Sequence, residues 1–168
     1  ITDDDDPPTV YFTNSDGVNG SEGGSVDEGS SSTLGISLSA ASEKTVTIYY
    51  SDAATGDATS GDDYTAITAN SILTIAGGAG TTASSIMVTS SNDDIYEGDQ
   101  TVVVSLATTD AVTGDMPTVS NASLTGDANL TTSYTLTITD TDLPPVVNFL
   151  DAADATSTSN SVTEAAGT

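Results

Sequence analysis

Acidic side chains gather in four short segments of this chain, and carboxylate oxygens are the ligands that hard divalent cations prefer. The segments hold Glu28, the loop from Asp52 to Asp63, the run 92–99, and the pair Asp140 and Asp142. Carboxylates that are packed together repel one another and lose hydration, and a bound cation offsets both costs. The four segments therefore indicate a cation site, provided that the fold brings them to one place.

The rest of the composition narrows the choice of cation. Zinc and copper favour His and Cys ligands, and the 168-residue chain contains neither residue type. Mg²⁺ demands tighter octahedral geometry and keeps more waters, whereas Ca²⁺ accepts six to eight oxygens in flexible geometry. We therefore expect Ca²⁺. For any single Asp, a solvated loop or the surface of a salt-adapted protein is the preferred explanation, and only the set of segments together favours a metal.

The same composition excludes several classes of function. The formal net charge is −24, from 25 acidic residues and the single base Lys44, so the chain cannot neutralise nucleic-acid phosphates or an anionic membrane surface. No stretch approaches the roughly 18 apolar residues of a membrane span. Catalysis is not expected, since the usual general base and thiol nucleophile are missing and two Phe, six Tyr and no Trp are too few for an aromatic-lined sugar cleft.

Apolar residues recur with a period of two, which is typical of strands that have one buried face and one wet face. Leu34, Ile36 and Leu38 alternate with small or polar residues, and the same holds around Leu136 and Ile138. The pattern predicts an all-β chain folded as an antiparallel β-sandwich of about seven strands. Strand-like stretches lie at 9–13, 25–29, 33–39, 45–51, 71–76, 84–89, 100–107 and 133–139.

The beginning of the chain recurs near its end. Eight residues of the segment 1–12 are repeated in 138–149 at one constant offset, including the Pro pair, and Val26-Asp27-Glu28 returns as Val162-Thr163-Glu164. Such self-similarity predicts a tandem array. Residues 1–7 would then be the end of a preceding repeat together with the junction. Residues 8–142 would form one repeat, and 143–168 would be the start of the next.

The predicted order of strands places several acidic segments at one end of the sandwich. In an antiparallel sandwich the chain reverses at each loop, so every second loop along the chain lies at the same end. The loop after 45–51, the loop after 84–89 and the exit from 133–139 are therefore expected to converge close to the domain junction. Pro144-Pro145, which stiffens the backbone on both sides, follows directly.

Five fragments follow one another along the chain: Val26-Asp27-Glu28, Val46-Thr47-Ile48-Tyr49-Tyr50, 57–64, Asp93-Asp94-Ile95-Tyr96-Glu97-Gly98-Asp99-Gln100 and 136–142. In type, order and spacing these fragments resemble the Calx-beta family. The resemblance covers almost all of 8–142, and it implies a seven-stranded immunoglobulin-like sandwich with a cluster of Ca²⁺ ions at the end that faces the next domain.

The resemblance also implies a set of metal ligands. One acid of the family pattern has no clean equivalent here, so Asp52 or Asp57 must take its place. Gln100 stands where the family commonly has an acid, and this departure implies fewer ions or weaker binding. The implied ligands are the side chains of Glu28, Asp93, Asp94, Glu97, Asp140 and Asp142 and the backbone carbonyl of Ile95.

The function expected from these observations is structural and adhesive. The chain would be a repeat of a large extracellular surface protein or filament of bacterial or archaeal type, stiffened by Ca²⁺ at junctions with similar repeats and exposed to a cell-surface or matrix ligand. Strand donation between chains by 146–150 is a variant of this hypothesis. Glycan acceptor triplets begin at Asn19, Asn121 and Asn129. The alternatives are a calcium-sensing regulatory module of a membrane-associated protein, as in sodium–calcium exchange proteins, and an accessory domain of an enzyme.

Overall fold

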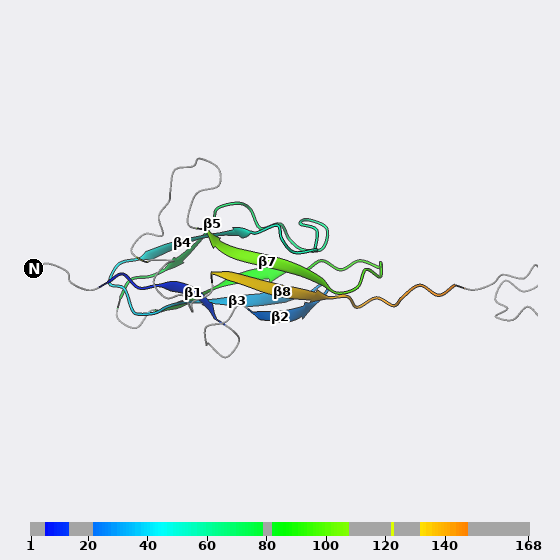
Figure 1. Ribbon diagram of the computed structural model, residues 1–168, viewed down its shortest axis with the longest axis horizontal. Coiled ribbons are helices and arrows are strands. Elements are labelled where there is room, and N and C mark those ends of the chain that lie inside the picture. The colour runs from blue at the N-terminus through cyan, green and yellow to red at the C-terminus, as the bar shows by residue number, and fades with distance from the viewer. Residues whose placement is uncertain (1–5, 14–21, 79–81, 108–121, 123–131, 148–168) are drawn as a thin grey trace, which may run out of the picture.

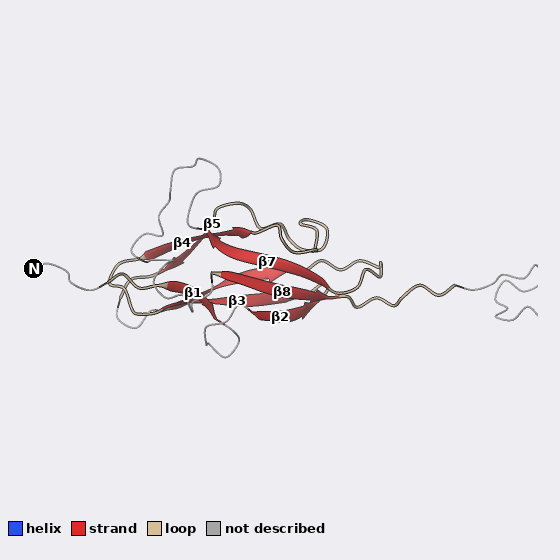
Figure 2. Ribbon diagram, viewed as in Figure 1, coloured by secondary structure: helices blue, strands red, loops and turns tan. Residues whose placement is uncertain are grey.

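The computed structural model describes residues 6–13, 22–78, 82–107, 122 and 132–147, and every regular element in this part of the chain is a β-strand (Figures 1 and 2). The all-β expectation is confirmed, and each predicted stretch overlaps one of the strands. The strands are β1 (Val10–Thr13), β2 (Glu22–Asp27), β3 (Ser31–Leu38), β4 (Val46–Asp52), β5 (Ser71–Ile75), β6 (Ala83–Thr89), β7 (Gln100–Ala107) and β8 (Ser133–Thr139).

The strands form two sheets packed as a sandwich. One sheet has three strands in the order β1-β3-β6, and the other has five in the order β2-β8-β7-β4-β5. All pairs but one are antiparallel. Strands β1 and β2 lie in different sheets, so the first part of the chain crosses from one sheet to the other.

The two sheets bury the alternating apolar side chains that the sequence pattern singled out. The ring centroids of Phe12 on β1 and Tyr134 on β8 lie 5.6 Å apart and tilted, which joins the two sheets through an aromatic contact. The chain contains no cysteine, so this apolar core stabilises the sandwich without disulfides. The core residues are Val10, Phe12, Val26, Leu34, Ile36, Leu38, Val46, Ile48, Tyr64, Ile75, Ile86, Val88, Val102, Val104, Leu106, Tyr134, Leu136 and Ile138.

One pair of strands departs from the antiparallel expectation. Strand β2 lies parallel to β8, with Val26 beside Ile138, and the register shifts between Glu22 and Ser25. The Tyr134 hydroxyl accepts a hydrogen bond of 3.0 Å from the backbone N–H of Gly24, within the irregular part of the pair. The chain's crossing between sheets explains the parallel direction, because β2 joins the larger sheet at its edge without a hairpin to its neighbour.

The described chain begins at one end of the sandwich and leaves at the other. Residues before β1 lie at one end, here called the N-terminal pole, and β8 runs out at the opposite, C-terminal pole into 140–147 (Figure 1). None of the described residues forms a helix that could cross a membrane. Only residues 143–147 of the predicted next repeat are described, and the acceptor residues Asn19, Asn121 and Asn129 lie outside the described residues.

Candidate metal centre

The parallel pair β2–β8 brings two acidic segments together at the C-terminal pole. Glu28 follows β2 directly and Asp140 follows β8 directly, and the Glu28 backbone N–H donates to the Thr139 carbonyl oxygen at 3.2 Å. Gly29 then turns the chain at a φ of 71°, a conformation that favours glycine. Glu28 and Asp140 are far apart in sequence, yet the parallel register makes them neighbours.

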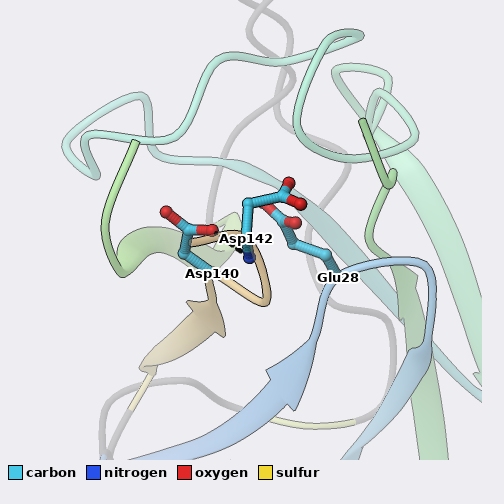
Figure 3. A group of neighbouring side chains, drawn as sticks. All are labelled: Glu28, Asp140 and Asp142. Carbon is cyan, nitrogen blue, oxygen red and sulfur yellow. Dashed lines mark hydrogen bonds between the residues drawn. The ribbon is translucent and has the colours of Figure 1, made fainter. Parts of the chain in front are cut away.

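Three carboxylates form a compact group at this pole, and we call Glu28, Asp140 and Asp142 the carboxylate triad (Figure 3). One oxygen from each residue lies within 4.8 Å of one oxygen from each of the others. Oxygens bound to one Ca²⁺ lie about 2.3–2.6 Å from the ion, so two of them can be up to roughly 5 Å apart. The spacing of the triad therefore suits one shared ion of this size.

Two oxygens of the triad have no hydrogen-bond partner among the described residues. They are Oε2 of Glu28 and Oδ2 of Asp142, and both atoms are buried. A buried carboxylate oxygen that accepts no hydrogen bond is costly, because it has lost its water without a replacement. A hard cation between the two side chains would supply that missing partner, and an all-oxygen donor set is the one that such a cation selects.

The electrostatics of the triad also favour added positive charge. Burial is the main cause that raises the pKa of Glu28 above its ordinary value, and the charges of Asp140, Asp142 and Asp93 raise it further against a hydrogen bond from the Thr141 backbone. Burial, followed by the charge of Asp140, likewise raises the pKa of Asp142. Without a cation, burial and mutual repulsion therefore disfavour the charged forms of Glu28 and Asp142.

Asp140 differs from the other two members because the backbone satisfies its charge. Its Oδ2 accepts the N–H groups of Glu97, at 2.7 Å, and Gly98, while its Oδ1 accepts the N–H of Asp142 at 2.8 Å. These bonds, Gly98 first, hold the pKa of Asp140 below its ordinary value. Asp140 thus stays ionised and fixes the loop 91–99 onto the strand exit.

The loop 91–99 places the other predicted ligands around the triad. The charge of Asp93 acts on Glu28, Asp142 and Glu97, and that of Asp94 acts on Asp142. Burial and the charges of its acidic neighbours raise the pKa of Glu97. Ile95 donates its N–H to Oδ1 of Asp93 at 2.8 Å, which shapes this turn. These four residues line the same pole as the triad, and their roles as ligands stay predictions.

The structure places Asp52 and Asp57 in local hydrogen bonds outside the triad. Asp52 accepts the Ala54 N–H at 2.8 Å and the Tyr64 hydroxyl at 2.5 Å. Oδ1 of Asp57 accepts both the N–H and the hydroxyl of Thr101, and these bonds lower the pKa of Asp57. Both side chains therefore have a structural role, and their assignment as ligands stays a prediction.

Two acids at this pole were not among the predicted ligands. The charge of Asp63 is, after burial, the largest influence on Glu97, and its backbone carbonyl accepts the Ser91 N–H at 2.8 Å. Oδ1 of Asp99 accepts the Asp140 N–H at 3.2 Å. Both residues lie in acidic segments that the sequence shows, but only the folded loops reveal which acids face the pole.

The loops meet as the strand order predicted. Ser90 and Ser91, after β6, contact the β4–β5 loop through Tyr64 and Asp63, and Gly29 donates its N–H to the Ser91 carbonyl at 3.1 Å. Together with the Glu97–Asp140 bond, these contacts join four acidic segments at one pole. The residues present fit a hard divalent cation held by carboxylate oxygens.

Solved structures with a similar fold include domains of Calx proteins. The apo form of the Calx CBD1 domain aligns with a TM-score of 0.56 and 15% identity, covering 82% of this chain and 100% of that one. CBD12 from CALX1.2 aligns with a TM-score of 0.54 and 14% identity, covering 80% of this chain and 46% of that one, so this chain spans about half of that structure. The calcium binding domain CBD12 of CALX1.1 aligns with a TM-score of 0.51 and 15% identity, covering 70% of this chain and 41% of that one.

Comparison of sequences gives the family. No curated protein sequence matches the chain. The family model described as the Calx-beta domain matches residues 3–142, which is most of the chain and includes both strands that carry the carboxylate triad. This match confirms the resemblance drawn from the motif fragments, and the sandwich of two sheets agrees with it: the chain belongs to the Calx-beta domain family.

Proposed function

We propose that this domain binds Ca²⁺ at its C-terminal pole and serves as a structural, adhesive repeat of an extracellular surface protein or filament. One observation carries the calcium part of the proposal. Two buried carboxylate oxygens, from Glu28 and Asp142, have no hydrogen-bond partner in the described part of the chain, and they belong to a triad whose spacing suits one Ca²⁺. The likeness of the fold to the calcium binding domain CBD12 of CALX1.1 supports the same ion.

The position of the triad supports a role at a junction between repeats. Asp142 is separated by one residue from Pro144-Pro145, and residues 143–147 are exposed. Since the described chain begins and leaves at opposite poles, successive units would be arranged end to end (Figure 1). An ion on Asp140 and Asp142 would then hold the first residues of the connection against the sandwich, and the Pro pair would carry this stiffness onward. Neighbouring repeats are the partners in this proposal, and no catalytic step belongs to it.

Calcium would also contribute to stability. A ligand that binds only the folded state adds RT ln(1 + [L]/Kd) to the free energy of unfolding, which is about 2.7 kcal/mol at a hundredfold excess over Kd. The chain has no disulfides to supply such a contribution. Millimolar calcium outside cells is enough to occupy even weak sites of this kind.

Thermal unfolding tests the calcium site directly. The melting temperature of the full chain is measured in Ca²⁺, in Mg²⁺ and in chelator at one fixed ionic strength. The expected result is a clear upward shift with Ca²⁺ that Mg²⁺ does not reproduce and that Glu28→Gln removes. Equal melting temperatures in all three solutions, with stability that follows ionic strength alone, would reduce the acidic pole to a solvated surface.

The structural role has its own test. Small-angle scattering of two units joined through 143–147 compares the particle's maximum dimension and flexibility in Ca²⁺ and in chelator. A stiff repeat predicts an extended, narrow distribution of dimensions in Ca²⁺ and a broader one in chelator. Labelling of intact cells with a membrane-impermeant reagent tests the extracellular location, and protection from the label would contradict it.

A further inference from the structure

We propose that the parallel pair β2–β8 is a mechanical clamp that transmits tension along the chain, and that the cation closes this clamp at the C-terminal pole. The inference rests on the calcium site proposed above, but its test is separate. Force applied before β1 and after β8 acts at opposite poles and pulls along the strands (Figure 1).

Strand β1 is the weaker of the two terminal strands. It spans only Val10–Thr13 and lies at the edge of its sheet, where its one strand partner is β3. Strand β8 spans Ser133–Thr139 and lies between β2 and β7, with Leu136 and Ile138 buried. Because fewer backbone hydrogen bonds hold β1, it is expected to leave first under tension.

Release of β1 places the tension directly across β2 and β8. The force then acts on the N-terminal end of β2, near Glu22, and on the C-terminal end of β8, near Thr139. These two strands are parallel neighbours, so the two forces point in opposite directions along one shared ladder. All hydrogen bonds between them are sheared together, whereas strands pulled apart from one end lose their bonds one at a time.

Contacts along the whole length of the pair resist this sliding. Ser25, Val26 and Asp27 lie in register with Thr137, Ile138 and Thr139. Near the start of the pair, the Gly24 N–H donates to the Tyr134 hydroxyl at 3.0 Å, and at its end the Glu28 N–H donates to the Thr139 carbonyl oxygen at 3.2 Å. The side chain of Tyr134 thus replaces part of the ladder where the register shifts.

The carboxylate triad spans the same pair of strands. Glu28 continues β2, while Asp140 and Asp142 continue β8, so an ion shared by the triad links the two strands at the pole where tension leaves the domain (Figure 3). Any sliding of β8 relative to β2 must then stretch metal–oxygen contacts as well as hydrogen bonds. Ca²⁺ would therefore raise resistance to force in addition to thermal stability.

Single-molecule force spectroscopy on the full chain, with handles at its two ends, tests the clamp. The expected trace has two events. The first is a short extension at low force as β1 detaches, about 3.5 Å for each residue of β1 that is freed, and it is insensitive to Ca²⁺. The second is the main rupture, and its force is higher in Ca²⁺ than in chelator.

Matched variants separate the parts of the clamp. Glu28→Gln should remove the calcium-dependent rise of the second event and leave the first event unchanged. Tyr134→Phe should lower the second rupture force in Ca²⁺ and in chelator alike, because it removes only the bond to Gly24. Tyr49→Phe is the control, since it deletes a hydroxyl from β4, outside the pair.

The results distinguish the clamp from the calcium site. If Ca²⁺ raises the melting temperature but leaves the second rupture force unchanged, the clamp is wrong and the calcium site stands. If Tyr134→Phe and Tyr49→Phe, both shown to be folded by circular dichroism, rupture at the same force as the parent chain, the β2–β8 pair does not carry the tension. If neither the melting temperature nor the rupture force responds to Ca²⁺, the proposed function fails first.

Discussion

The backbone N–H of Glu97 donates to Oδ2 of Asp140 at 2.7 Å, and this bond joins the loop after β6 to the exit of β8. The same carboxylate also accepts the N–H groups of Gly98 and Asp142. Asp140 is therefore a structural member of the pole as well as a candidate ligand. Glu28 and Asp142 each have a buried carboxylate oxygen with no hydrogen-bond partner among the described residues, so their main role is that of candidate ligands. This difference makes the three residues separable by mutation.

Asp140→Ala is expected to lower the melting temperature by several degrees in chelator as well as in Ca²⁺. The substitution leaves the N–H groups of Glu97 and Gly98 without their acceptor, independently of any ion. Glu43→Ala, on an exposed acid away from the pole, is the control for loss of one negative charge. Thermal melts of both variants check the prediction, and a loss confined to Ca²⁺ would show that Asp140 acts only as a ligand.

Glu28→Gln and Asp142→Asn are expected to have opposite effects in the two solutions. In chelator, each substitution removes one charge from a repulsive group, so the melting temperature rises. In Ca²⁺, each removes a charged ligand, so the shift produced by the ion falls or disappears. Melting curves at a single ionic strength test this reversal. A variant that is less stable than the parent chain in both solutions contradicts it.

In chelator, the difference in melting temperature between Glu28→Gln and the parent chain should depend on pH. The pKa of Glu28 is higher in the folded state than its ordinary value of 4.5. Protonated Glu28 therefore stabilises the fold at a pH below 4.5, and this stabilisation is lost as the pH rises through the folded-state pKa. The variant should therefore exceed the parent chain in melting temperature at pH 7, and the two should converge as the pH falls into the ordinary carboxyl range. A difference that is constant with pH would show that charge is not the cause.

Tyr64 is expected to ionise above the ordinary pH range of a tyrosine. Burial, followed by its hydrogen bond to Asp52, raises the pKa of Tyr64 from 10.0 to about 12. The sign follows from linkage: the stabilisation is complete below pH 10 and is lost as the pH rises from 10 to about 12. Tyrosinate absorbance during an alkaline titration should contain one late step that Tyr64→Phe removes. The exposed Tyr96 supplies the control variant, Tyr96→Phe, which should keep the late step.

Tyr64→Phe is also expected to reduce the free energy of unfolding at neutral pH, by about 1–2 kcal/mol. It deletes a buried donor to a carboxylate, and such bonds contribute more than bonds between neutral groups. Denaturant unfolding of this variant and of Tyr96→Phe measures the difference. Equal stability of the two variants would show that the Tyr64–Asp52 bond makes no net contribution.

Asp57→Ala discriminates between a structural and a ligand role. The carboxylate of Asp57 accepts the N–H and the hydroxyl of Thr101, which anchors the β4–β5 loop to the start of β7. If anchoring the loop is its main role, the variant has a lower melting temperature in chelator and keeps the full rise in melting temperature with Ca²⁺. A diminished calcium shift would instead place Asp57 among the ligands.

The local pattern of apolar residues was enough to predict the strands. The composition limited the expected metal-binding atoms to oxygen. Alternating apolar residues such as Leu34, Ile36 and Leu38 define a buried face whatever their partners are, so strand positions could be read directly. The absence of His and Cys left oxygen as the ligand atom. The partner of β2 could not be read in this way, because a period of two does not say whether a neighbouring strand is parallel or antiparallel.

An all-β domain with acidic loops at its strand ends could be predicted from residue chemistry alone, because burial of alternating apolar residues and repulsion between carboxylates do not depend on which strands pair. Which of these acids come together depends instead on how the strands pair. The parallel register of β2 and β8 places Glu28 beside Asp140, residues that no local pattern connects. Folding likewise directed Asp52 and Asp57 to Tyr64 and Thr101, because hydrogen bonds across loops depend on where those loops meet.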